Sequence, residues 1–161
     1  MLTIRPAEPR DCPLLVDLIR ELAVYEKLEH EAIATPADLL RDGFGPTPRF
    51  EAAVAAWDGA PAGFALWFYN YSTFAGRHGL YLEDLFVRPV FRGKGIGKAL
   101  LVHLARLAQA QGCARYQWQV LDWNTPSIEF YQRLGARRLP EWLTMRVEGE
   151  ALERLAALGP R

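Results

Sequence analysis

The stretch from Leu80 to Leu104 constrains the fold more than any other part of the chain. It begins as an apolar strand that carries two adjacent carboxylates, Glu83 and Asp84, and it pauses at Pro89. A basic, glycine-rich loop follows over residues 92–98, and an amphipathic helix comes next. Unpaired amides and the positive end of the helix dipole meet where such a loop enters a helix, which favours anions. The stretch therefore predicts a site for a phosphorylated ligand.

Length and composition predict one globular unit, a single domain over residues 1–161. Half of the 161 residues are hydrophobic, which is enough to bury a core. Nineteen basic residues balance nineteen acidic residues, so no overall field favours nucleic acid or an acidic membrane surface. We expect no nucleic-acid partner and no membrane association. Any charged partner must be bound by a local patch.

The cysteine pattern indicates a reducing compartment. Cys12 and Cys113 lie far apart, without a CxxC or Cys/His spacing, and the first residues lack the apolar segment of a signal peptide. A cytoplasmic location without a disulfide or metal is expected. The three histidines are scattered along the chain and do not form a ligand set.

Hydrophobic periodicity and turn residues predict alternating strands and helices, with a hairpin at Asp58-Gly59. The second half alternates strand, helix, strand, helix, so its sheet should be partly parallel. The fold class is therefore α/β, or mixed α+β. The expected strands cover residues 2–5, 50–57, 61–71, 80–87, 114–121 and 143–147, and the expected helices cover residues 11–28, 36–42, 96–111, 124–134 and 151–158.

The glycine loop differs from two common phosphate-binding loops. A Walker A loop has four residues between its glycines and a hydroxyl after its lysine, whereas Gly93 and Gly97 enclose three residues and Ala99 follows Lys98. The dinucleotide pattern GxGxxG also fails, because the glycines stand at 93, 95 and 97. An Arg-x-x-Gly-x-Gly pattern beginning at Arg92 is left. An ordinary strand-to-helix turn that needs glycine for its backbone angles is the alternative explanation.

A second pair of residues lies downstream, where Asn124 begins a helix that carries Tyr131. Seven residues span almost two helical turns, so both side chains can point to one side. Both can line one ligand site. Alternatively, Asn124 is only a helix cap and Tyr131 only a core aromatic residue.

These features together resemble the GCN5-related N-acetyltransferase superfamily, whose acyl-CoA pyrophosphate loop has the Arg-x-x-Gly-x-Gly pattern. The blocks LAVYEKLE, LLRDGFG, YLEDLFV, RGKGIGKALL and VLDWNTPSIEFYQRLGA, with the later Trp142, resemble the diamine acetyltransferase (spermidine/spermine N-acetyltransferase-like) family over nearly the whole chain. YSTF-x-GR and GC-x(6)-VLDWN are similar to its thialysine-acetylating branch. The resemblance implies a twisted mixed sheet with helices on both faces, and a homodimer in which the partner subunit completes the amine site.

The resemblance also assigns roles to residues. Tyr131 is the expected general acid, and Glu83 the expected acceptor of the amine proton through water. A free amide after Asp84 would polarise the thioester carbonyl. The acetyl-CoA site comprises Leu85, Phe86, Val87, Arg92, Gly93, Lys94, Gly95, Ile96, Gly97, Lys98, Asn124, Ser127 and Tyr131, and the small-molecule amine site comprises Tyr25, Glu26, Glu83, Asp84 and Trp142.

Two points limit these assignments. Neighbours on a regular strand point to opposite faces, so Glu83 and Asp84 share a face only if the strand is bulged. Without a bulge, each is explained equally well as a solvent-facing or ion-paired carboxylate. Ser72 and Phe74 stand where polyamine enzymes of the family carry an acidic residue and a tryptophan, and Leu134 replaces a basic residue.

The chain has fewer carboxylates at these positions than the polyamine enzymes have. This favours a short diamine or a diamino acid as substrate, because each distal ammonium of a longer amine needs its own partner. Acetylation of a protein lysine or N-terminus, and a non-catalytic acyl-CoA-binding module, are the two alternatives to this function.

Overall fold

The computed structural model describes residues 1–159, which fall into two compact units that meet in sequence between Leu121 and Asp122. That the whole chain forms one domain stays a prediction. Among the described residues, no helix combines the length and the apolar character needed to span a membrane.

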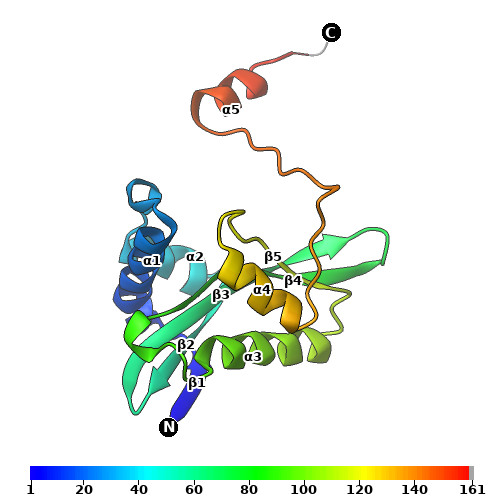
Figure 1. Ribbon diagram of the computed structural model, residues 1–161. Coiled ribbons are helices and arrows are strands. Elements are labelled where there is room, and N and C mark those ends of the chain that lie inside the picture. The colour runs from blue at the N-terminus through cyan, green and yellow to red at the C-terminus, as the bar shows by residue number, and fades with distance from the viewer. Residues whose placement is uncertain (160–161) are drawn as a thin grey trace. The chain divides into compact units, whose positions relative to one another are not determined.

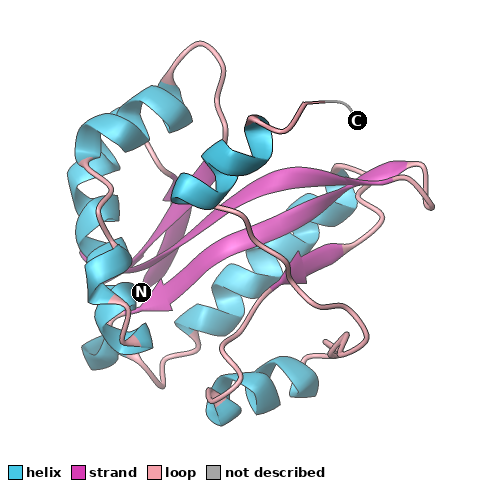
Figure 2. Cartoon of the chain, turned by 90° about the horizontal axis from the view of Figure 1, so that it is seen from above, coloured by secondary structure: helices cyan, strands magenta, loops and turns pink. Residues whose placement is uncertain are grey.

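A five-stranded mixed sheet in the order β1-β2-β3-β4-β5 forms the first unit. The first four strands pair antiparallel and β5 pairs parallel with β4. The β3–β4 hairpin forms the long centre of the sheet, and its two strands run side by side in Figures 1 and 2. The strands are β1 (Leu2–Pro6), β2 (Glu51–Trp57), β3 (Ala60–Ser72), β4 (Arg77–Val87) and β5 (Tyr116–Trp118).

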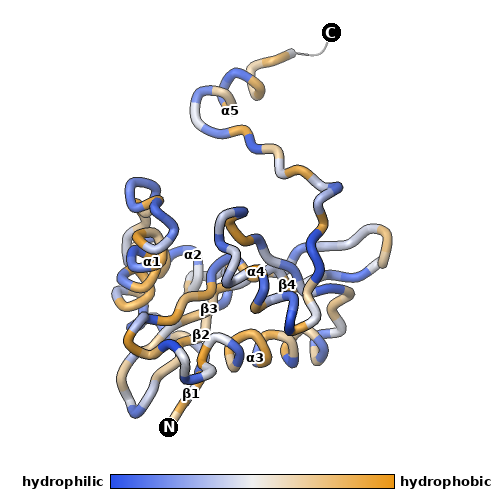
Figure 3. Tube along the Cα trace, viewed as in Figure 1, coloured by the Kyte–Doolittle hydropathy of each residue, from blue (hydrophilic) through white to orange (hydrophobic). Residues whose placement is uncertain are grey.

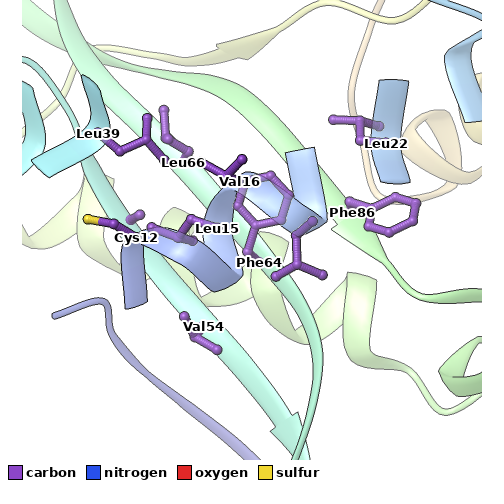
Figure 4. Close-up of a cluster of buried hydrophobic side chains, with 11 residues drawn as sticks. Cys12, Leu15, Val16, Leu22, Leu39, Val54, Phe64, Leu66 and Phe86 are labelled. Atoms are coloured by element: carbon purple, nitrogen blue, oxygen red, sulfur yellow. The ribbon is translucent and has the colours of Figure 1, made fainter. Parts of the chain in front are cut away.

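Three α-helices pack with this sheet: α1 (Cys12–Glu26), α2 (Pro36–Phe44) and α3 (Ile96–Ala110). The main hydrophobic cluster lies between α1 and one face of the sheet, where Phe64 is fully buried close to Leu15 and Val16 (Figure 4). Phe86 of β4 belongs to this cluster.

The other face of the sheet is covered by α3. Leu85 and Val87 alternate with Phe86 along β4, so their side chains point away from α1. They are the side chains nearest to the position of a Cβ on Gly97 of α3. Hydrophobic stretches run along both β3 and α3 (Figure 3). The expected mixed α/β class, with helices on both faces of the sheet, is therefore confirmed.

Asp11 is a typical capping residue at the start of the first helix, but its side chain makes no cap hydrogen bond. Its carboxylate instead accepts two hydrogen bonds from the guanidinium of Arg5, at 2.7 and 2.8 Å, and one from the backbone N–H of Glu8, at 2.7 Å. These contacts tie β1 to the start of α1 and hold the pKa of Asp11 below its usual value, mainly through the Arg5 hydrogen bond.

Several expected boundaries differ from the structure. The first helix ends at Glu26 rather than Leu28, because Lys27 takes a left-handed conformation (φ 60°). The amides of Lys27 and Leu28 then bond back to the carbonyls of Val24 and Ala23, which closes the helix end. β4 begins at Arg77 rather than Leu80, since the hairpin register extends to its tip, and β5 spans only residues 116–118 of the expected 114–121.

The second unit contains helices α4 (Thr125–Arg133) and α5 (Gly149–Ala156). The strand expected over residues 143–147 is wrong, because this segment has no regular structure (Figure 1). Leu143 and Met145 are exposed. Alternating apolar residues predicted a strand, but a strand forms only where a neighbour accepts its backbone hydrogen bonds.

Candidate functional site

A β-bulge in β4 determines where the two adjacent carboxylates point. Leu66 of β3 pairs with Asp84 and Trp67 pairs with Leu82, so Glu83 has no partner on β3. Paired residues share a face of the sheet, and Leu66 belongs to the α1 cluster, so Asp84 also faces α1. Leu82 shares the opposite face with Trp67, and Glu83, next in the strand, returns to the α1 face. The bulge therefore puts Glu83 and Asp84 on one face.

A third carboxylate comes from the C-terminal end of α1. The charges of Glu83 and Glu26 both act on Asp84, so the three groups form one electrostatic cluster, here called the carboxylate cluster. Burial, followed by these two charges, raises the pKa of Asp84 to about 7. Burial also raises the pKa of Glu26. Concentrated negative charge of this kind suits a ligand that carries ammonium groups.

An ion pair fixes α1 against the end of β4, next to the carboxylate cluster. Arg88 donates three hydrogen bonds to the carboxylate of Glu21, at 2.8–3.1 Å, and one to the carbonyl of Pro61, at 3.0 Å. Glu21 lies one helical turn before Tyr25 and Glu26. The sequence does not predict this pair, because Glu21 and Arg88 lie far apart in the chain and belong to no common motif.

The edge of β4 beyond the bulge is left open by β5. Pairing between β4 and β5 covers only Leu80–Leu82 of β4. The amide of Arg88 bonds to the carbonyl of Ala62 on β3, and backbone groups alternate along a strand. The amides of Leu85 and Val87 consequently point to the open edge, whereas that of Phe86 points to β3. Of the three residues expected near the thioester, Phe86 is a core residue whose amide is directed away from the open edge.

The glycine loop leads from this edge into α3. Gly93 and Gly95 have positive φ angles of 78° and 77°, which suit glycine. Gly95 occupies the cap position of α3, and no side chain caps the helix. Ile96 is buried and anchors the helix start in the core. The first-turn amides of α3 are thus presented at the loop, as binding of a pyrophosphate requires.

The basic side chains of the loop have different surroundings. Arg92 lies over the ring of Tyr25, with its Cζ 4.9 Å from the ring centroid, and Lys94 lies over Trp57, with its Nζ 4.9 Å from the ring centroid. Lys98, in the first turn of α3, is exposed. The structure thus joins Tyr25, which was predicted for the amine site, to Arg92, which was predicted for the cofactor site.

The remaining predicted residues belong to the second unit. Asn124 is buried at the cap position of α4, yet its side chain makes no cap hydrogen bond. Helix capping therefore does not explain why an asparagine is buried at this position. Ser127 and Tyr131 lie four residues apart on α4, and this spacing places them on one side of the helix. Trp142 lies in the irregular segment before α5 and is 76% exposed. Their assignment to an acetyl-CoA and amine site stays a prediction.

Ser72 is a residue whose role the structure clarifies. It is buried at the end of β3, where its hydroxyl accepts a hydrogen bond from the amide of Ala75, at 3.2 Å, in the hairpin turn. Phe74 at the tip of the same turn is fully exposed. Ser72 therefore supports the turn and adds no charge to the site.

No group of three or more His, Cys, Asp or Glu side chains within residues 1–159 is arranged to hold a metal ion.

Comparisons with known proteins identify relatives of this chain. The sequence profile of the "Acetyltransferase (GNAT) family" matches residues 15–136. The chain is 41% identical to the thialysine N-epsilon-acetyltransferase of Sus scrofa, over 95% of this chain and 96% of that protein. It is 31% identical to the L-ornithine N5-acetyltransferase NATA1 of Arabidopsis thaliana, over 96% and 88% of the two chains. An integron cassette protein from the mobile metagenome of V. cholerae superposes with a TM-score of 0.82, at 29% identity and 98% coverage of both chains.

The raised pKa of Asp84 predicts how stability depends on pH. In the unfolded chain the carboxyl ionises near pH 3.8, whereas in the fold it keeps its proton to about pH 7. The folded state therefore binds more protons between these values, and Asp84 lowers stability progressively as pH rises through that window. The substitution Asp84→Asn should raise the free energy of unfolding by roughly 1–3 kcal/mol at pH 8.5 and by much less at pH 3.5.

Denaturant unfolding at a series of pH values measures this difference, and Asp122→Asn at an exposed position is the control. A stability gain that does not depend on pH, or a loss of stability at pH 8.5, would contradict the raised pKa.

Proposed function

Because the chain belongs to the acetyltransferase (GNAT) family and is an N-acetyltransferase, we propose that it transfers the acetyl group of acetyl-CoA to a primary amine of a small diamine, polyamine or diamino acid such as thialysine. The carboxylate cluster of Glu26, Glu83 and Asp84 is the observation that carries this proposal. An acceptor with two cationic groups needs opposite charges where it binds, and this cluster supplies them on one face of the sheet.

Acetyl-CoA would be held by the glycine loop and would supply an activated thioester. The free amides at the start of α3 suit its pyrophosphate, and Gly93 and Gly95, whose positive φ angles favour glycine, present no side chain to that approach. The amides of Leu85 and Val87 are the candidates to donate to the carbonyl oxygen as negative charge develops on it.

The amine must lose a proton before it attacks, because an alkylammonium group has a pKa near 10.4. In this proposal Glu83 accepts that proton through water, beside Asp84, whose own pKa of about 7 would fall when a cation binds. The amine nitrogen then forms a bond to the acetyl carbon, the carbon–sulfur bond breaks, and the nitrogen releases its second proton to solvent as the amide forms. Tyr131 gives its phenolic proton to the departing sulfur, and solvent restores that proton.

A short acceptor fits the observed charges better than a long polyamine does. Thialysine and ornithine, the acceptors in the names of two relatives, each carry two amino groups. The turn position of Ser72 provides no carboxylate for a distal ammonium. We therefore expect the diamino acids to be acetylated with higher kcat/KM than spermidine.

Turnover across an amine panel tests the function. Thialysine, lysine, ornithine, putrescine, spermidine and a lysine-containing peptide are compared, with coenzyme A affinity measured in parallel. Tyr131→Phe should lower kcat by about 10- to 100-fold with little change in coenzyme A affinity, because general acid catalysis contributes on this scale. Glu83→Gln should lower kcat/KM for the amine by about 10-fold or more.

Tyr69→Phe serves as the matched control for the tyrosine substitution, since the hydroxyl of Tyr69 bonds to Glu51 on the sheet. Acetyl-CoA binding without acetylation of any amine would support the binding-module alternative and overturn the proposal. Acetylation of the peptide alone would support the protein-acetylating alternative.

We also propose a homodimer, to which the exposed aromatic side chains of Tyr71 and Phe74 at the β3–β4 hairpin contribute contact area. Light scattering at micromolar concentration should give twice the chain mass, and Phe74→Ser should weaken the association. A monomeric mass for the wild-type protein would contradict the dimer.

A further inference from the structure

Arg92 opens the glycine loop, and its exposed side chain contacts three protein groups. Its Cζ lies 4.9 Å from the ring centroid of Tyr25 and 5.7 Å from that of Phe86. Its Nε donates a hydrogen bond of 3.0 Å to the carbonyl of Val87. The planar guanidinium suits this arrangement, because it can stack on aromatic rings and donate in its own plane.

These contacts connect two sites that are otherwise carried by different elements. Tyr25 is the neighbour of Glu26 at the end of α1, and Phe86 and Val87 follow the carboxylates of β4. Arg92 itself begins the loop that leads to the free amides of α3. One side chain therefore connects the loop expected to hold the pyrophosphate with Tyr25, the residue next to Glu26 of the carboxylate cluster.

We propose that Arg92 is a positioning residue that couples the two binding events: acetyl-CoA on the glycine loop strengthens amine binding at the carboxylate cluster through the contact of Arg92 with Tyr25. This inference rests on the proposed function. Cofactor bound to the loop amides restrains the backbone that carries Arg92, and the contact of Arg92 with Tyr25 passes this restraint to the end of α1, where Glu26 lies. Linkage requires the reverse effect as well, so the amine strengthens cofactor binding by the same factor.

Coenzyme A is the probe of choice, because it occupies the loop but carries no acetyl group and permits no turnover. Calorimetry gives the dissociation constant of thialysine with and without saturating coenzyme A. In the wild-type protein, coenzyme A should tighten thialysine binding about five- to ten-fold, within the usual range of coupling between sites. Arg92→Met, which keeps a long side chain but removes the cation and the donor, should bring this ratio close to one.

Two further variants separate positioning from simple charge. Arg92→Lys keeps the cation over the rings but loses the planar donor to Val87, so it should restore only part of the ratio. Lys94→Met removes a cation from the same loop, yet Lys94 lies over Trp57 rather than Tyr25. This control should leave the ratio unchanged even if it weakens coenzyme A binding.

An Arg92→Met protein that keeps the wild-type ratio would overturn the inference. If Arg92→Met kept the wild-type ratio but bound coenzyme A more than about ten-fold more weakly, the guanidinium would be a direct cofactor ligand instead. A wild-type enzyme that acetylates thialysine with a ratio of one would refute the coupling and leave the proposed function intact. A wild-type protein that binds no coenzyme A would refute both.

Discussion

One unpaired residue in the central hairpin is the feature on which the site depends. Without the bulge at Glu83, the alternation of β4 would direct Glu83 and Asp84 to opposite faces of the sheet. With it, both carboxylates lie on the face covered by α1, where Glu26 joins them. Burial of the Asp84 carboxylate, followed by the nearby charges of Glu83 and Glu26, disfavours its ionised form and raises its pKa. A cationic ligand favours the ionised form on binding.

The same strand also carries the backbone amides proposed to bind the thioester carbonyl. Beyond the bulge, β4 is no longer paired with β5, so the amides of Leu85 and Val87 are available at its open edge. The chain then turns through the glycine loop into α3, whose first amides are uncapped. The proposed sites for the amine, the thioester and the pyrophosphate thus follow one another within a single strand–loop–helix segment, and Arg92 at its turn contacts residues from α1 and β4.

Much of this was accessible from the sequence, because the loop pattern, the strand carboxylates and the helix periodicity are local signals. The bulge was recognised only as a requirement, since a one-residue shift in register is decided by pairing with β3. The Arg88–Glu21 pair and the Arg92–Tyr25 contact join residues far apart in sequence. No local sequence pattern predicts such contacts. The strand predicted over residues 143–147 is absent, because an alternating pattern is a local signal and does not provide a neighbouring strand for pairing. Asp11 carried a valid capping signal, but the nearby Arg5 guanidinium binds its carboxylate.

Proton release on amine binding tests the central claim, that the carboxylate cluster is the amine site, most directly. Thialysine is titrated into the complex with coenzyme A at pH 7, by calorimetry in buffers of different ionisation enthalpy. The wild-type protein should release about half a proton, because an arriving cation lowers the pKa of Asp84, which lies at about 7, and the Asp84→Asn variant should release markedly less. Binding with no proton release, or with the same release in both proteins, would contradict this claim.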